Sequence, residues 1–142
     1  MALGKLSALQ QQILIALANL RPTWTLTGGA ALAGFHTQHR ETRDLDLFFH
    51  HQRELGSIVA DATEALRYVG LAVIPVRSST TFAQLDVRLE NESTIVDLVA
   101  DPTPVAEVAQ AMTVDDATIM VERFRQDLVE RVMAEARPGD SK

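Results

Sequence analysis

The residues best suited to chemistry are two aspartates within a short apolar run, Asp44-Leu45-Asp46-Leu47-Phe48-Phe49. Successive side chains of a β-strand point to opposite faces, so a strand here places Asp44 and Asp46 on one face and the leucines in a core. Two carboxylates roughly 7 Å apart repel each other, and burying either one alone is costly. A divalent cation that prefers oxygen ligands would relieve this repulsion, so the spacing indicates a metal site. The alternative is a pair of edge-strand aspartates neutralised by Arg40 or Arg43.

A third aspartate lies in another strand-like segment. Asp97 interrupts the apolar residues 93–100 and shares a strand face with Ile95 and Val99. An aspartate in such a position has few explanations besides a buried partner or a metal, although a locally satisfied strand carboxylate is the simpler one. Asp86 competes with it for the role, but Asp86 belongs to an alternating polar face that is typical of a solvated strand.

A glycine pair, Gly28-Gly29, stands where a predicted strand gives way to a predicted helix. Glycine lets the backbone approach a ligand closely. The start of the following helix offers free N–H groups and a positive dipole end, which favour phosphate. The alternative is an ordinary turn at the entry to a helix.

These residues must be positioned by alternating helices and strands. Apolar periodicity and turn residues predict helices over 3–20, 30–36, 52–69, 105–111 and 122–136, and strands over 23–27, 44–49, 71–76, 81–89, 93–100 and 117–121. A turn at Asn91-Glu92 favours antiparallel pairing within 71–100. The expected fold class is α/β (α+β), with a mixed β-sheet flanked by helices. The buried face of the helix over 52–69 is expected to comprise Leu55, Ile58, Val59, Ala62, Leu66 and Val69, with Gly70 ending it.

Composition narrows the function. The chain has 142 residues, of which 46% are hydrophobic and 23% charged, as in one compact domain. There is no cysteine, which suits a cytoplasmic protein, and we see neither a signal peptide nor an apolar run long enough for a membrane. A net charge of -6 argues against a broad nucleic-acid surface. Basic residues are mostly arginine, which favours a small anionic ligand.

Other side chains are assigned to structure. The four histidines match no common zinc spacing, and His50-His51 are expected to end the aspartate strand in solvent. Trp24 is expected in the core rather than as a platform for stacking a base.

Two segments together resemble a known family. They are Leu26-Thr27-Gly28-Gly29-Ala30-Ala31-Leu32-Ala33 and His39-Arg40-Glu41-Thr42-Arg43-Asp44-Leu45-Asp46-Leu47-Phe48. This pattern looks like the N-terminal signature of AbiEii/AbiGii-type nucleotidyltransferase toxins, which belong to the polymerase β-like nucleotidyltransferase superfamily. The matching stretch covers residues 26–48, with a weaker continuation through the Asp97 strand.

The resemblance implies a nucleotidyltransferase fold and a metal-dependent reaction. Asp44 and Asp46 would hold one or two Mg²⁺ (or Mn²⁺) ions, and Asp97 would be the third catalytic carboxylate, sharing a metal and helping to orient or deprotonate an acceptor hydroxyl. Gly28 and Gly29 would cradle the triphosphate of a nucleoside triphosphate. Arg40 and Arg43 would contact phosphate or simply neutralise the aspartates; both roles stay open.

The resemblance also implies a biological setting. RNA, tRNA among its forms, is the expected acceptor, and an antitoxin protein is the expected partner of a toxin acting in growth arrest or phage defence. The family's toxins generally continue into a larger C-terminal helical region with further basic residues. Residues 1–142 would then form a single minimal nucleotidyltransferase-like domain without that region.

Two rival functions remain at this point. The first is a non-catalytic domain of the same fold that binds a nucleotide or a protein partner. The other rival is a different Asp-x-Asp metal enzyme, such as a sugar-nucleotide transferase. The upstream glycine pair favours the nucleotidyltransferase fold over this last alternative.

Overall fold

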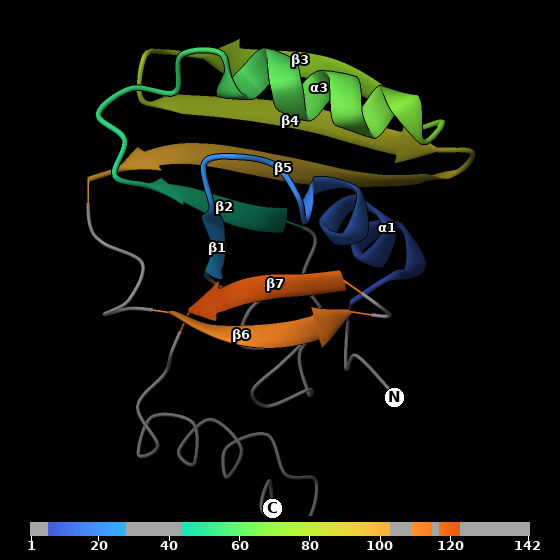
Figure 1. Ribbon diagram of the computed structural model, residues 1–142. Coiled ribbons are helices and arrows are strands. Elements are labelled where there is room, and N and C mark those ends of the chain that lie inside the picture. The colour runs from blue at the N-terminus through green and yellow to red at the C-terminus, as the bar shows by residue number, and fades with distance from the viewer. Residues whose placement is uncertain (1–5, 28–43, 103–108, 115–116, 123–142) are drawn as a thin grey trace, which may run out of the picture.

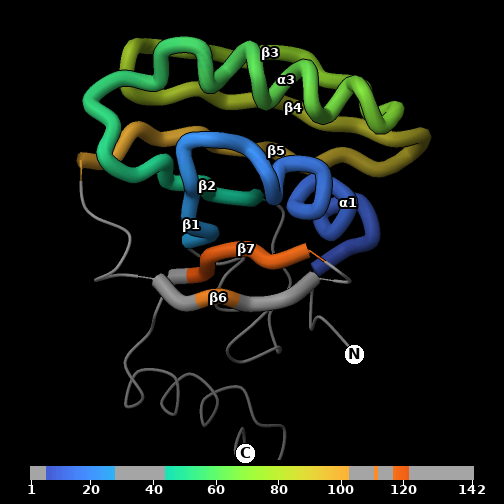
Figure 2. The backbone as a smooth tube through the Cα atoms, in the orientation of Figure 1, coloured from blue at the N-terminus to red at the C-terminus, as the bar shows by residue number. Residues whose placement is uncertain are grey.

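The computed structural model describes residues 6–27, 44–102, 109–114 and 117–122, and the strands among them form one seven-stranded mixed sheet. The strand order is β3-β4-β5-β2-β1-β7-β6 (Figures 1 and 2). The described elements are α1 (Ala8–Leu17), β1 (Trp24–Thr27), β2 (Asp44–His50), α3 (Ile58–Tyr68), β3 (Ala72–Ser78), β4 (Phe82–Leu89), β5 (Glu92–Asp101), β6 (Ala109–Val114) and β7 (Ala117–Glu122). The predicted fold class is confirmed.

The sheet combines antiparallel and parallel strand pairs. β3, β4 and β5 form an antiparallel meander, which confirms the expected pairing within 71–100. β5 then lies parallel to β2, β2 antiparallel to β1, and β1 parallel to β7. The β4–β5 turn is one residue earlier than predicted: Leu89 pairs with Glu92, so the two loop residues are Glu90 and Asn91.

The hydrophobic core lies on one face of the sheet, beneath α1 and α3 (Figure 1). Alternate residues of β2, β4 and β5 enter this core and are almost completely buried, as the period of two requires. Trp24 joins them, and its indole Nε1 donates a hydrogen bond of 2.7 Å to the Leu17 carbonyl. This contact ties the end of α1 to β1 and confirms the structural role expected for the tryptophan.

Both described helices are shorter than predicted. α1 starts after Ser7, whose hydroxyl accepts from the Gln10 backbone N–H at 3.0 Å while the Gln10 side chain accepts from the Ser7 N–H at 2.9 Å. This capping box satisfies two N–H groups that the first turn leaves unpaired. The second helix, α3, begins at Ile58 rather than residue 52. Gly56, with φ +53°, lies in a turn just before it.

The end of α3 confirms the predicted stop. Gly70 has φ +93°, its N–H donates to the Arg67 carbonyl, and the Leu71 N–H donates to the Leu66 carbonyl. This pair of hydrogen bonds is the Schellman arrangement that glycine favours. Of the predicted buried face, Leu55, Ile58, Ala62 and Leu66 are buried and Val59 is partly buried against the core, whereas Val69, at the C-cap, is 53% exposed.

Two other predictions are wrong. Residues 109–111 belong to β6 rather than to a helix over 105–111, because β6 pairs with β7 as a hairpin. His50 is buried rather than solvated. Its ring Nε2 contacts the Thr25 hydroxyl oxygen, and its backbone N–H donates to the Thr23 carbonyl. His51, by contrast, is exposed.

Several predictions lie outside the described residues. They are the helix over 30–36, the helix over 122–136 beyond Glu122, and the part of 105–111 that precedes Ala109. Within the described residues, no helix is both long enough and apolar enough to cross a bilayer.

Candidate functional site

Asp46 and Asp97 lie side by side on neighbouring parallel strands. Residues 44–50 of β2 pair in register with residues 95–101 of β5, and this register makes Asp46 the direct partner of Asp97. Leu45 and Leu47 are fully buried among the helices, so the aspartates point to the opposite face. Both aspartates are half-buried there. The side chains of Asp46 and Asp97 therefore share one face of the sheet.

The same row continues across two more strands. Gln84 of β4 is the partner of Asp97, and Thr27 of β1 is the partner of Asp46. The Gln84 side-chain amide donates a hydrogen bond of 2.9 Å from Nε2 to Asp97 Oδ1. Four polar side chains therefore form one line across β4, β5, β2 and β1.

Electrostatics single out Asp46. Burial raises the pKa of its carboxyl from 3.8 to about 6, with further contributions from a side-chain hydrogen bond with Asp97 and from the negative charges of Asp97 and Asp44. The Asp46 carboxyl therefore binds a proton more readily than an ordinary aspartate and takes one up as pH falls toward about 6. A positive charge is the alternative way to relieve the same repulsion.

The other two aspartates lie in the next row along the strands. Ile95 is the partner of both Asp44, on β2, and Asp86, on β4. Asp44 is exposed, on the same face as Asp46. The Asp86 carboxylate accepts from Arg88 Nε and Nη2 at 3.2 and 2.8 Å, so a cation already faces it. This pairing favours Asp97 over Asp86 as the third carboxylate.

The donor set fits a hard divalent cation. Carboxylate oxygens are the ligands that Mg²⁺ and Mn²⁺ take in proteins, and two half-buried carboxylates are direct strand partners here. Among the described side chains, no three of the His, Cys, Asp or Glu type already form a cation cage. Asp44 would therefore have to approach the pair, or the remaining ligands would have to come from solvent or substrate.

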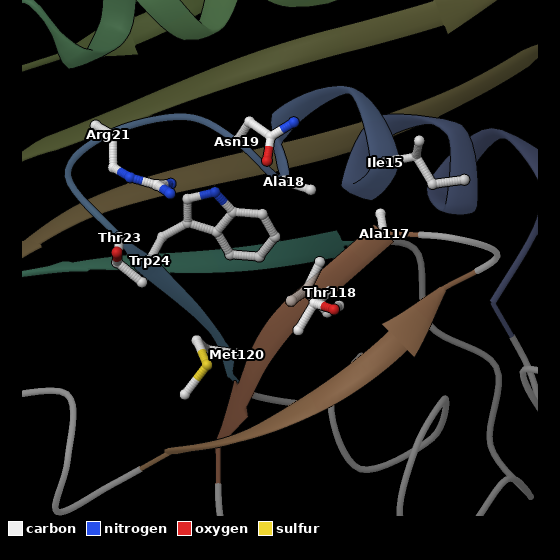
Figure 3. Close-up of a pocket in the computed structure, with 10 residues that line it drawn as sticks. Ile15, Ala18, Asn19, Arg21, Thr23, Trp24, Ala117, Thr118 and Met120 are labelled. Carbon is white, nitrogen blue, oxygen red and sulfur yellow. The ribbon is translucent and has the colours of Figure 1, made fainter.

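A hollow of about 730 Å³ lies elsewhere, between the end of α1, the start of β1 and β7 (Figure 3). Its described lining contains the cation Arg21 and the indole of Trp24 but no carboxylate. It lies on the α1 side of β1, whereas the carboxylates project from the opposite face of the sheet. We therefore do not assign it to the predicted site.

The remaining predicted residues cannot be placed. Gly28, Gly29, Arg40 and Arg43 lie outside the described residues, so their phosphate-binding roles stay predictions. Gln84 was missed because it looked like any polar residue on an alternating strand. Asp97 itself indicated that some residue must donate a hydrogen bond to it, because an aspartate on a central strand needs a donor. The sequence does not reveal which strand lies beside β5 and therefore which residue that donor is.

Solved structures with the same arrangement define the class of fold. A Thermotoga maritima protein classed as a candidate nucleotidyltransferase superposes with a TM-score of 0.54 at 14% identity, over 87% of this chain and 80% of that one. The Mycobacterium tuberculosis nucleotidyltransferase toxin MenT4 superposes with a TM-score of 0.53 at 16% identity, over 83% of this chain and 47% of that one. A candidate nucleotidyltransferase from Helicobacter pylori superposes with a TM-score of 0.51 at 18% identity, over 82% of this chain and 54% of that one. The fold is that of nucleotidyltransferases, and the chain spans about half the length of the last two proteins.

The family follows from sequence. The model of the family described as "Nucleotidyl transferase AbiEii toxin, Type IV TA system" matches residues 12–92, more than half of the chain. The protein therefore belongs to the AbiEii nucleotidyltransferase toxin family, as the resemblance predicted. No curated protein matches it significantly.

Proposed function

We propose that this protein is a metal-dependent nucleotidyltransferase that transfers a nucleoside monophosphate from a nucleoside triphosphate to an acceptor hydroxyl. The observation that carries the proposal is the direct pairing of Asp46 with Asp97, with Asp44 on the same face, in a member of a nucleotidyltransferase toxin family. Neighbouring carboxylates at this density are unfavourable unless a cation or a proton lies between them.

The chain's own groups divide the work. Asp44, Asp46 and Asp97 would hold the cation, and Asp97 would also orient or deprotonate the acceptor hydroxyl. Gly28 and Gly29 cradle the triphosphate, while Arg40 and Arg43 either contact it or balance the aspartates. When bound, one or two Mg²⁺ (or Mn²⁺) ions would stabilise the attacking and leaving oxygens of an in-line displacement with pyrophosphate as leaving group.

The setting follows from the family. Its description as a type IV toxin of a toxin–antitoxin system supports a toxin role, with an antitoxin as partner. We propose RNA, including tRNA, as the acceptor, and the cytoplasm, where nucleoside triphosphates and RNA are available, as the location. We further propose that residues 1–142 act as one minimal catalytic domain.

The test is label transfer. The protein is incubated with Mg²⁺, each α-³²P-labelled nucleoside triphosphate in turn, and total RNA or purified tRNA. We expect label in RNA and release of pyrophosphate. Asp44→Ala and Asp46→Asn should each reduce transfer by more than about 100-fold, beyond the effect typical of residues that only support a metal ligand.

A charge-matched control is available in Glu92→Gln, which removes one carboxylate at the exposed start of β5 and should leave transfer unchanged. If the wild-type protein binds Mn²⁺ and nucleotide but labels no acceptor with any nucleotide, the chain is a non-catalytic nucleotidyltransferase-like domain. Equal activity of Asp46→Asn and wild type would remove the aspartates from the mechanism.

A further inference from the structure

The strongest further feature is the amide of Gln84. Its Nε2 donates to Asp97 Oδ1 at 2.9 Å, and the two residues are direct partners across β4 and β5. Because a carboxylate only accepts, the amide must turn its NH₂ group toward Asp97. Both side chains are half-buried, so the hydrogen bond is partly shielded from water.

The chemical type of this donor matters. An amide orients a carboxylate without neutralising it, whereas a guanidinium or ammonium does both. Both kinds of pairing involve the same face of β4, at residues two apart. Asp86 is paired with the cation Arg88, whereas Gln84 gives a neutral donor to Asp97 on β5. Gln84 therefore holds one oxygen of Asp97 in place without bringing a positive charge to the carboxylate.

The strand order also determines which residues lie on either side of the Asp97 carboxylate. Gln84 approaches from β4, on one side of β5, and Asp46 lies on the other side, on β2. With Oδ1 held from the β4 side, the Asp97 carboxylate lies between its donor Gln84 and its strand partner Asp46.

We propose that Gln84 is a positioning residue, whose uncharged amide holds the Asp97 carboxylate in the orientation that binds the divalent cation together with Asp46. This inference rests on the proposed function, because it assumes that the pair binds a cation. Gln84 itself would touch neither the cation nor the nucleotide.

The experiment measures Mn²⁺ binding to the full chain by electron paramagnetic resonance, without nucleotide or acceptor. Gln84→Met keeps the length of the side chain but loses the donor, and Mn²⁺ affinity should fall by about 10-fold, as for other residues that support a ligand. Gln84→Lys keeps a donor but adds a positive charge beside Asp97, and binding should fall further than in Gln84→Met. The matched control Gln11→Met makes the same substitution on α1, where the Gln11 amide donates to the Leu6 carbonyl at 3.2 Å, and it should bind like wild type.

Circular dichroism and melting temperature establish that each variant folds. If Gln84→Met does not fold, Gln84→Asn carries the same test, because it withdraws the amide by one methylene and should also weaken binding. A second readout is the Mg²⁺ dependence of transfer: Gln84→Met should require more Mg²⁺ for half-maximal activity while recovering most of kcat at saturation. A role in packing alone would not shift that requirement.

The outcomes separate this inference from the proposed function. If Asp97→Asn abolishes Mn²⁺ binding while Gln84→Met binds like wild type, the metal site stands and the role of Gln84 is refuted. If Gln84→Lys binds as well as wild type or better, the argument from the neutral donor is wrong. If the wild-type protein does not bind Mn²⁺ at all, both proposals fail.

Discussion

At the scale of single residues, Asp46 has two ways to relieve its charge. It lies beside Asp97 and on the same face as Asp44, and it is half-buried. In the cation-free protein it meets this cost through a pKa raised to about 6, which favours a proton. A proton and a metal ion thus compete for the same oxygens, so pH and metal should have linked effects on the protein.

This linkage predicts how stability changes with pH. Since the folded pKa of about 6 exceeds the ordinary value of 3.8, the folded state binds the proton more tightly than the unfolded state. The stabilising contribution is complete below about pH 4 and is lost as pH rises through about 6. Without metal, we expect the free energy of unfolding to fall by at most about 3 kcal/mol over this range on account of Asp46.

Urea unfolding in EDTA at pH 4, 5, 6 and 7 measures this dependence. Asp46→Asn is the reference, because an amide does not titrate but keeps nearly the same shape. The variant should be more stable than wild type at pH 7 and similar to it at pH 4. Parallel pH curves for the two proteins would contradict the assignment.

At the scale of elements, periodic strands and capped helices build the face that carries the carboxylates. β2, β4 and β5 each alternate between the core and the opposite face, so every second residue is available for chemistry. α3 covers the core face and ends at Tyr68, and the chain turns at Gly70 before it enters β3. The hydrogen bonds that end α3 involve only nearby residues, so a substitution at Gly70 should change stability without changing the candidate site.

We expect Gly70→Ala to destabilise the protein by about 1–2 kcal/mol, because φ +93° is a conformation that L-residues avoid. No atom lies within 4 Å of the added Cβ, so the cost comes from the backbone rather than from a clash. Gly70→Asn should lose less, since asparagine tolerates positive φ better. Chemical denaturation measures both variants. Equal stability of Gly70→Ala and wild type would contradict the strain, and altered Mn²⁺ affinity would contradict its local character.

At the scale of the whole molecule, the proposed cation joins strands that are distant in sequence. β2 and β5 are parallel neighbours, yet α3, β3 and β4 lie between them along the chain. A ligand that bridges Asp46 and Asp97 binds only the folded arrangement, and it therefore stabilises that arrangement by mass action.

Mg²⁺ should consequently raise the melting temperature. At a free concentration ten times its Kd, the gain is about 1.4 kcal/mol, which corresponds to a few degrees for a domain of this size. EDTA should reverse the shift, and Asp46→Asn and Asp97→Asn should abolish it. Differential scanning calorimetry at constant ionic strength, with Na⁺ as the control salt, measures the effect. A melting temperature indifferent to millimolar Mg²⁺ would count against a shared site.

Much of this architecture is present in local sequence patterns. The strands with a period of two, the buried face of α3 and the glycine stop after it are all determined by neighbours within a few residues, so they were predictable. The family signature around Asp44 and Asp46 was likewise local. The errors fell where local signals were weak or overridden: residues 109–111 pair with β7, and His50 finds a buried partner in Thr25.

What the sequence alone determined is which side chains can share a face of their own strand. Only the tertiary structure decided which strands lie together, because register and strand order depend on the summed burial of the whole core rather than on any short segment. That order places Asp97 between Asp46 and Gln84, and it turns an isolated strand aspartate into the centre of a row of polar groups.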